Sequence, residues 1–166
     1  SNQMLLNTKT ERLPDGLGND SGLLGKYIAF HNYLGSISAS IEGFEDMYYY
    51  GRRPTQPIIP NFRNVKRQEM DFLRGYASFF GAYRGRGGSS EMQVGGDFKD
   101  SLSEVGGWGI GMMMQGETIP KEENHVRLSP DLKDKFGMAQ LIFHVGYDDN
   151  DQKSMQDFLD QGAEML

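Results

Sequence analysis

Apolar residues alternate with small or polar residues along several stretches of the chain, and this pattern predicts strands that each bury one face. Residues 35–42 set three apolar side chains against three serines. The same period of two runs through residues 71–82. Between residues 107 and 146 the pattern indicates three successive strands, separated by residues that are typical of turns.

The first and third of these successive strands have two faces of different character. One face is apolar and carries Trp108, Ile110, Met112 and Met114, and on the third strand Leu141, Phe143 and Val145. The other face carries Gly107, Gly109, Gly111, Met113 and Gln115, and on the third strand Gln140, Ile142 and His144. We expect helices to cover the apolar face, whereas a glycine-lined face lets another group approach the backbone closely. The alternative interpretation of the glycines is a β-bulge or close packing of strands.

Two segments have the spacing of amphipathic helices and are expected to lie on the apolar face. They are residues 97–105 and residues 150–166. The expected fold class is therefore α+β, with an antiparallel sheet of about six strands and helices packed on one face. Trp108 and Phe143 should share that face. Residues 3–20 should form a short extended piece followed by a loop.

Composition limits the classes of protein to which this chain can belong. It has 166 residues, 22 glycines and a formal net charge of −6. This charge argues against a nucleic-acid partner, which needs clustered Lys and Arg to neutralise phosphates. No apolar run has the length of a membrane span, so we expect a soluble protein without a membrane partner, in the cytoplasm or the periplasm. Because cysteine is absent, disulfides and zinc–thiolate sites are excluded.

Few residues form a motif of known chemistry. The three histidines do not have the spacing of a metal-ligand pair. The glycines of residues 16–22 lack the spacing and the preceding strand of a dinucleotide-binding loop. The acidic residues 148–151 lack the glycine and the final glutamate of a calcium loop. Residues 84–90 are basic and glycine-rich, which fits a solvated hairpin tip, a phosphate clamp or a lid. Among the histidines, His144 is the best candidate for function, because it shares a face with Gln140.

Short segments spread along the chain carry a family resemblance. They are Leu5-Leu6-Asn7, Gly16-Leu17-Gly18-Asn19, Gly116-Glu117, Pro120-Lys121-Glu122-Glu123-Asn124, Val126-Arg127-Leu128 and Asp134-Lys135-Phe136-Gly137. In this order they resemble the glucose–methanol–choline (GMC) family of FAD-dependent oxidoreductases. The resemblance is nearest to the sugar-oxidising branch that includes pyranose 2-oxidase.

The resemblance implies that this chain is part of a longer enzyme. In the family, FAD is held by a separate N-terminal part, and the catalytic His follows the helix that residues 150–166 match. We therefore expect residues 1–34 to be the segment that leaves the flavin domain, and residues 35–166 to be the substrate-binding domain. The parent enzyme would hold FAD and oxidise CH–OH groups, whereas this part alone would bind no FAD and would be inactive. Its partners would be the missing flavin domain and a sugar or alcohol substrate.

The resemblance also selects side chains for substrate binding. An arginine that lines the cavity of the relatives aligns with Met113, and this departure leaves the substrate undefined. The strand that contains Arg74 and Tyr76 is similar to the strand that leads into the substrate loop of the relatives. No catalytic residue is expected in this chain. The candidate substrate-binding residues are Arg74, Tyr76, Met113, Gln115, Gln140 and His144.

The alternative function is a free-standing carbohydrate-binding or protein-interaction module without enzyme activity. Its aromatic surfaces would be Tyr48, Tyr49, Tyr50, Tyr76 and Tyr83. In an isolated domain, the glycine-lined face should be exposed or covered by a second copy in a homo-oligomer, because large apolar patches are rarely left open. Flavin fingerprints upstream in the gene and a His-rich motif downstream would favour the enzyme.

Overall fold

The computed structural model contains helices together with antiparallel sheets. It describes residues 1–47, 51–52, 56–86 and 94–166. Within these residues there are three helices and seven strands, and the strands lie in two sheets. Every strand pair with an assigned register is antiparallel. This arrangement confirms the α+β class that the sequence predicts.

The chain divides into two compact units. The first unit combines residues 1–31 with residues 117–150, and the second combines residues 32–116 with residues 151–166. Each unit is therefore discontinuous in sequence, because the chain leaves the first unit and later returns to it. The division predicted after residue 34 concerns the domains of a longer protein and stays a prediction.

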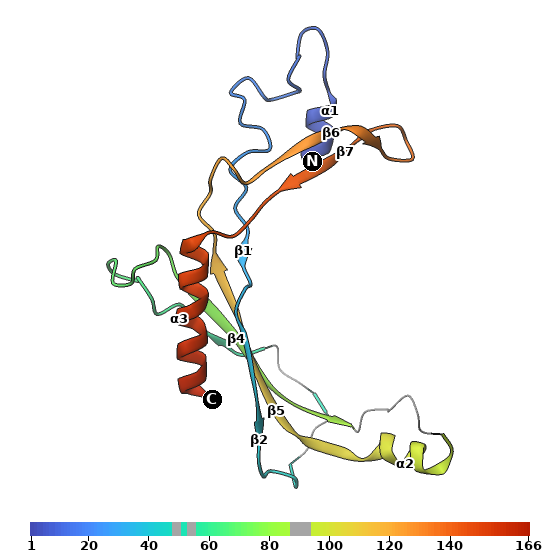
Figure 1. The fold of residues 1–166 in the computed structure, drawn as a ribbon, viewed down its shortest axis with the longest axis vertical. Helices are drawn as coiled ribbons and strands as arrows, with labels where there is room; N and C mark the ends of the chain where they lie inside the picture. Colours follow the sequence, from blue (N-terminus) through green and yellow to red (C-terminus); the bar gives the residue numbers. More distant parts are fainter. Residues whose placement is uncertain (48–50, 53–55, 87–93) are drawn as a thin grey trace. The chain divides into compact units, whose positions relative to one another are not determined.

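The second unit is built on a five-stranded sheet, which Figure 1 shows. Its strands are β1 (His31–Asn32), β2 (Ser36–Ile41), β3 (Ile58–Ile59), β4 (Tyr76–Arg86) and β5 (Val105–Glu117). β5 pairs with β1, β2 and β4, and β3 pairs with β4. The two stretches in which glycine or serine alternates with apolar residues, β2 and β5, are thus neighbours in the sheet.

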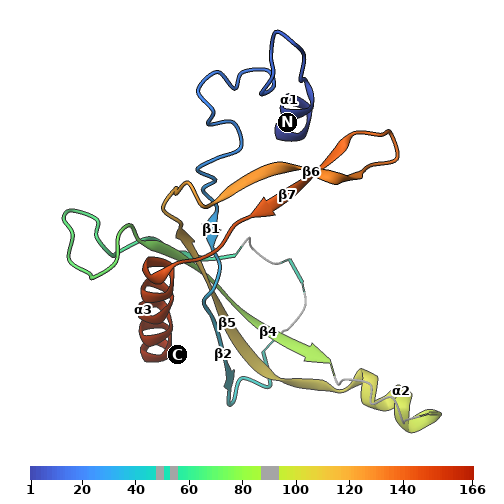
Figure 2. The ribbon, with the colours of Figure 1, turned by 45° about the horizontal axis from the view of Figure 1, so that its top comes forward.

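One face of this sheet packs against the helix α3 (Asp149–Met165), which runs along it in Figures 1 and 2. Met112 and Met114 of β5 are 5% and 0% exposed, whereas Met113 between them is 40% exposed. Phe158 of α3 belongs to the same buried cluster as Met112 and Met114. The predicted alternation in β5 is therefore confirmed, since its apolar face forms the core with α3.

Two glycines allow α3 to approach the sheet closely. A Cβ atom added at Gly35 would lie 3.0 Å from Cε1 of Phe158, and one added at Gly162 would lie 3.1 Å from Cγ2 of Ile37. Both distances are shorter than an ordinary van der Waals contact between carbon atoms. Any larger residue at these positions would push the helix away from the strands.

The first unit contains a hairpin and a short helix. The hairpin is formed by β6 (His125–Lys133) and β7 (Ala139–His144), and the helix is α1 (Asn2–Asn7). α1 contacts both strands of the hairpin. The side-chain amide of Gln3 donates a hydrogen bond to the carbonyl oxygen of Ala139 at 3.0 Å. This bond ties the helix to the first residue of β7.

The single sheet expected from the sequence is divided in the structure. Among the described strands, β7 pairs with β6 in a separate two-stranded sheet and does not pair with β5. Trp108 and Phe143 therefore lie in different sheets, and Phe143 is 64% exposed instead of buried. Alternation identifies the two faces of a strand, but it does not determine the strand with which it pairs.

Three expected elements also differ in place. The helix expected at residues 97–105 forms as α2 (Gly96–Ser103), but none of its residues is buried, and it lies beyond the ends of β4 and β5 in Figure 2. The N-terminal segment begins with the helix α1 instead of an extended piece. The strand expected from residue 71 begins at Tyr76, because Arg74 has a φ of 68°. A positive φ lies outside the strand region of backbone conformations.

Candidate functional site

The face of the five-stranded sheet opposite α3 is lined mainly by glycine and serine. The register places Ser36, Ser38 and Ser40 of β2 opposite Met113, Gly111 and Gly109 of β5. On the other side of β5, Phe79, Gly81 and Tyr83 of β4 face the same three positions. We call this surface the glycine–serine face. It consists of Ser36, Ser38, Ser40, Ala77, Phe79, Gly81, Tyr83, Gly107, Gly109, Gly111, Met113 and Gln115.

A pocket of about 350 Å³ lies on this face where Ser40, Gly109 and Tyr83 form a row across three strands. Its volume is at the lower end of the range of small-molecule sites, roughly 300–1,000 Å³. The pocket is lined by Ser38, Ala39, Ser40, Ile41, Tyr83, Gly107, Trp108 and Gly109.

Gly109 determines where the ring of Tyr83 lies. A Cβ atom added at Gly109 would be 2.8 Å from Cζ and 3.0 Å from the hydroxyl oxygen of Tyr83. An atom added at Gly111 would be 3.9 Å from the same ring, which is an ordinary contact. The ring therefore lies over the backbone of β5 at a distance that only glycine permits. Tyr83 nevertheless remains 51% exposed.

Met113 and Gln115 are two of the predicted substrate-binding residues, and both lie on the glycine–serine face. Met113 lies between Ser36 and Phe79 in the register, and Gln115 lies opposite Ala77. Met113 is exposed and Gln115 is half-buried. The side-chain amide of Gln115 carries both donor and acceptor atoms, so it can bind a hydroxyl group in either direction.

Tyr76 lies on the opposite face, beneath α3, which corrects its expected place beside the glycine-lined face. It is buried, and its hydroxyl donates a hydrogen bond of 2.6 Å to Oδ2 of Asp157. Asp157 also accepts two hydrogen bonds of 2.9 Å from the guanidinium of Arg63. Burial raises the pKa of Tyr76, and the hydrogen bond to Asp157 and its negative charge raise this pKa further. Tyr76 therefore belongs to the polar network that holds the core together.

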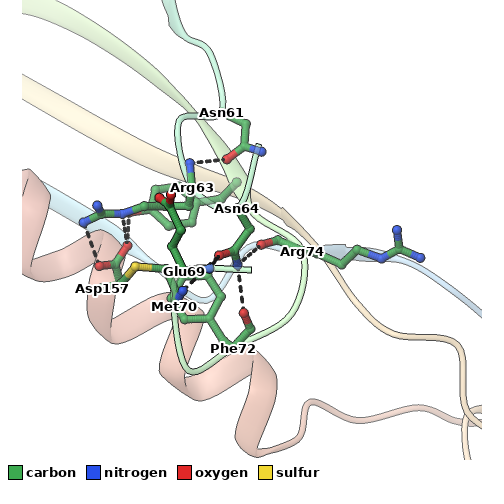
Figure 3. A network of polar contacts seen from close by, with 9 residues as sticks. Asn61, Arg63, Asn64, Glu69, Met70, Phe72, Arg74 and Asp157 are labelled. Carbon is green, nitrogen blue, oxygen red and sulfur yellow. Dashed lines mark hydrogen bonds and ion pairs between the residues drawn. The ribbon is translucent and has the colours of Figure 1, made fainter. Parts of the chain in front are cut away.

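Arg74 lies in the loop 61–75, which Asn64 organises (Figure 3). The side-chain amide of Asn64 donates hydrogen bonds to the carbonyl oxygens of Phe72 and Arg74, at 2.8 and 2.7 Å. Its Oδ1 accepts hydrogen bonds from the backbone N–H groups of Glu69 and Met70. Figure 3 shows the guanidinium of Arg74 pointing away from this network. Arg74 thus contributes its backbone to the loop, while its side chain is exposed.

Gln140 and His144 lie on β7 in the first unit, and both are exposed. The side-chain amide of Gln140 donates a hydrogen bond to the carbonyl oxygen of Lys133, at 3.1 Å. The ring of His144 stacks on that of His125 with a centroid distance of 4.8 Å. Its Nε2 accepts a hydrogen bond of 3.2 Å from Nε of Arg127.

The structure therefore brings the six predicted residues together only in part. Met113 and Gln115 share the glycine–serine face, and Gln140 and His144 share one face of β7. The expectation that all four lie on adjacent strands is wrong, because β5 and β7 belong to different sheets. The binding role of each residue stays a prediction.

Sequence reasoning assigned no site at Ser38 and Ser40. The alternation of serines in β2 was visible, and so was the aromatic character of Tyr83. The missing information was the register, which places Ser40 and Tyr83 on either side of Gly109. Other expectations fall outside the described residues, namely Tyr48 to Tyr50 and most of the basic loop at 84–90.

Two kinds of cofactor site can be checked against the described residues: a cluster of metal ligands and the glycine loop at residues 16–22. Among these residues, no group of three or more His, Asp or Glu side chains could hold a metal. The glycines of residues 16–22 follow the helix α1 and do not connect a strand to a helix, so they do not fit FAD phosphates. Among the same residues, no helix has the length and apolar character needed to cross a bilayer.

Comparison with known proteins relates most of the chain to a larger dehydrogenase. No family model matches the chain. It is similar to a protein of Mycolicibacterium austroafricanum that is named 2-methyl-1,2-propanediol dehydrogenase. The two are 29% identical over 143 residues, which cover 82% of this chain. The chain spans about a quarter of that relative, since the match covers 26% of its length.

Proposed function

We propose that this chain supplies the substrate-binding surface of an FAD-dependent oxidoreductase that acts on CH–OH groups of alcohols or sugars. The observation that carries the proposal is the similarity of 82% of the chain to a dehydrogenase named for a small diol. The ordered resemblance to GMC oxidoreductases supports the same reaction class. The antiparallel sheet covered by α3 on one face is consistent with a domain that presents its other face to a ligand.

The contribution of this chain to such a reaction is orientation. The flavin, when bound, accepts the hydride that leaves the carbinol carbon of the substrate. We assign the flavin-binding residues to another part of a longer protein, as the resemblance to GMC oxidoreductases implies. We assign to Gln115, on the glycine–serine face, a hydrogen bond to a substrate hydroxyl, and to Met113 an apolar contact with the substrate. Holding the substrate in a reactive orientation lowers the entropic part of the barrier.

The class of substrate rests on two separate arguments. The relative is named for a branched diol of four carbon atoms, which favours a small alcohol. The resemblance to the sugar-oxidising GMC branch favours a carbohydrate. Both kinds of compound carry neighbouring hydroxyl groups, and Gln115 can bind either through the same hydrogen bonds.

A test of the proposal uses the full-length polypeptide that contains this chain. After purification it should show flavin absorbance and should reduce a redox dye when supplied with 2-methyl-1,2-propanediol or D-glucose. The ratio of the two rates decides between a small diol and a sugar as the better substrate. A full-length protein without flavin, or one that oxidises neither compound nor any related alcohol, would contradict the proposal.

A further inference from the structure

We infer that the pocket on the glycine–serine face binds a neutral, polyhydroxylated ligand such as a sugar ring, stacked on Tyr83. Of the five tyrosines considered for stacking, Tyr76 is buried beneath α3 and three lie outside the described residues. Tyr83 is half-exposed and lines the pocket. Among the described members of this set, Tyr83 is therefore the ring that a ligand can reach.

The ring of Tyr83 is held in place before any ligand binds. Its Cζ and hydroxyl lie against the backbone of β5, in the space that a side chain at position 109 would need. A ring that is already fixed loses little conformational freedom on binding, and this favours stacking. The apolar C–H side of a sugar ring can lie on such an aromatic surface, with its hydroxyl groups directed to the edges.

Hydroxyl groups lie beside the ring on the same face. Ser38 and Ser40 are exposed on β2, and both line the pocket. With the phenol of Tyr83 they supply three groups that both donate and accept hydrogen bonds. Such groups match the hydroxyls of a polyol, which also donate and accept.

Among the residues that the structure describes, none of those that line the pocket is charged. Arg84 follows Tyr83 in sequence but belongs to the opposite face, where its guanidinium donates to the carbonyl oxygens of Gly106 and Glu45, both at 2.7 Å. An anionic ligand would therefore find no cation among these described lining residues. This favours a neutral ligand over a phosphate or a carboxylate.

The pocket is separate from the position proposed for the reacting substrate. Gly109 and Gln115 are six residues apart on β5, which corresponds to roughly 20 Å at the usual rise of a strand. One sugar ring cannot span that distance. The pocket would thus hold either a separate ligand or a remote unit of a longer carbohydrate, and it needs no flavin to do so.

The test is a titration of the 166-residue chain with methyl β-D-glucopyranoside. Amide resonances of Ser38, Ser40 and Gly109 should shift and saturate, with a dissociation constant on the order of 1–10 mM for so open a pocket. The amide resonance of Trp108, whose side chain lies on the opposite face beside Arg84, should shift less than that of Gly109. No saturable change up to about 100 mM would overturn the inference, as would equal binding of cyclohexanol, which has one hydroxyl.

Variants locate the binding at Tyr83. We expect Tyr83→Ala to weaken binding at least tenfold and Tyr83→Phe to weaken it less than about threefold, because only the first removes the ring. Gly109→Ala should displace the ring and weaken binding, whereas Gly111→Ala is the matched control with an added atom at an ordinary distance. Saturable shifts that persist in Tyr83→Ala, or equal effects of the two glycine variants, would refute the site. Because the titration uses no flavin, its result is independent of the proposed oxidoreductase activity.

Discussion

The hydroxyl of Tyr76 donates a 2.6 Å hydrogen bond to Oδ2 of Asp157, and this bond joins β4 to α3 beneath the sheet. Asp157 is also paired with Arg63, which lies in the loop 61–75. One carboxylate therefore connects a strand, a helix and a loop of the second unit. Because Tyr76 is buried, the loss of this bond cannot be replaced fully by water.

Replacing Tyr76 with Phe tests the contribution of this bond. A hydrogen bond to a charged group contributes about 1.5–3 kcal/mol, but Asp157 keeps its bonds to Arg63, so we expect a loss of about 1–2 kcal/mol. Urea unfolding of the chain measures it. Tyr83→Phe is the matched control, since that hydroxyl is on the exposed side of the sheet, and it should change stability by less than about 0.5 kcal/mol. Equal stability of Tyr76→Phe and the unaltered chain would show that the bond is not formed in solution.

The raised pKa of Tyr76 predicts a loss of stability at high pH. Its ordinary value is 10.0, and folding raises it because burial and Asp157 disfavour the phenolate. A group with a raised folded-state pKa stabilises the folded chain below its unfolded pKa, and this contribution is lost as the pH rises toward the folded pKa. The free energy of unfolding should therefore fall above about pH 10. The fall should be smaller in Tyr76→Phe, and parallel curves for the two proteins would contradict the prediction.

Asn64 should be the residue on which the loop 61–75 depends most. Asn64→Ala removes four hydrogen bonds between this side chain and the backbone of the loop. It also leaves an alanine at a φ of 52°, a conformation that asparagine tolerates better than alanine does. We expect the amides of Glu69 and Met70 to exchange with solvent at least about tenfold faster. Asn61→Ala is the control, because Asn61 accepts one backbone hydrogen bond, from Arg63. If both variants exchange alike, Asn64 does not organise the loop.

Alanine substitutions at two glycines of the first unit can distinguish the cost of backbone strain from the cost of a steric clash. Gly18 and Gly25 both have positive φ values, of 75° and 84°. A Cβ atom at Gly18 would meet open space, whereas one at Gly25 would lie 2.7 Å from the carbonyl oxygen of Val126. Gly18→Ala should cost about 1–2 kcal/mol through the backbone alone. Gly25→Ala should cost clearly more in a urea unfolding experiment, and equal losses would mean that the segment at Gly25 moves away from β6.

The sequence predicts which face of a strand is buried, but it does not predict the strand with which it pairs. The faces of β5 follow from alternation, because Met112 and Met114 could only be buried together on one side of a strand. The partner of a strand does not follow, and for this reason β7 was wrongly placed beside β5. Arg74 was assigned to a strand because its neighbours alternate, but the side chain of Asn64, ten residues earlier, holds that part of the chain in a loop.

The candidate site shows the same limit. Gln115 and Met113 could be placed on one face from their spacing, and the register confirms their common side. The pocket at Tyr83 could not be predicted, because it requires three strands in one register and a glycine beneath the ring. Tyr76 has the same residue type and the same strand as Tyr83. The two tyrosines are seven positions apart in sequence, and an odd separation places one in the core and the other on the glycine–serine face, in keeping with the alternation of β4.

In the full-length enzyme, the kinetics of a Gln115 variant can test the proposed substrate surface. If its side-chain amide binds a substrate hydroxyl, Gln115→Ala should lower kcat/KM by the equivalent of one hydrogen bond, about 0.5–1.5 kcal/mol or several-fold. Gln156→Ala is the matched control, because Gln156 is exposed on α3 and its amide bonds to Asp160 on the same helix. It should leave kcat/KM unchanged.

Gln140→Ala tests the other half of the sequence prediction, since Gln140 lies on the hairpin of the first unit. A several-fold loss in both Gln115→Ala and Gln140→Ala would mean that both units contribute to substrate binding. A loss in Gln115→Ala alone would confine the site to the glycine–serine face. Thermal unfolding of each variant must stay near that of the unaltered enzyme for the kinetic constants to report binding. Unaltered kinetics in Gln115→Ala would remove the central residue of the proposed substrate surface, because Met113 beside it has no group that hydrogen-bonds a hydroxyl strongly.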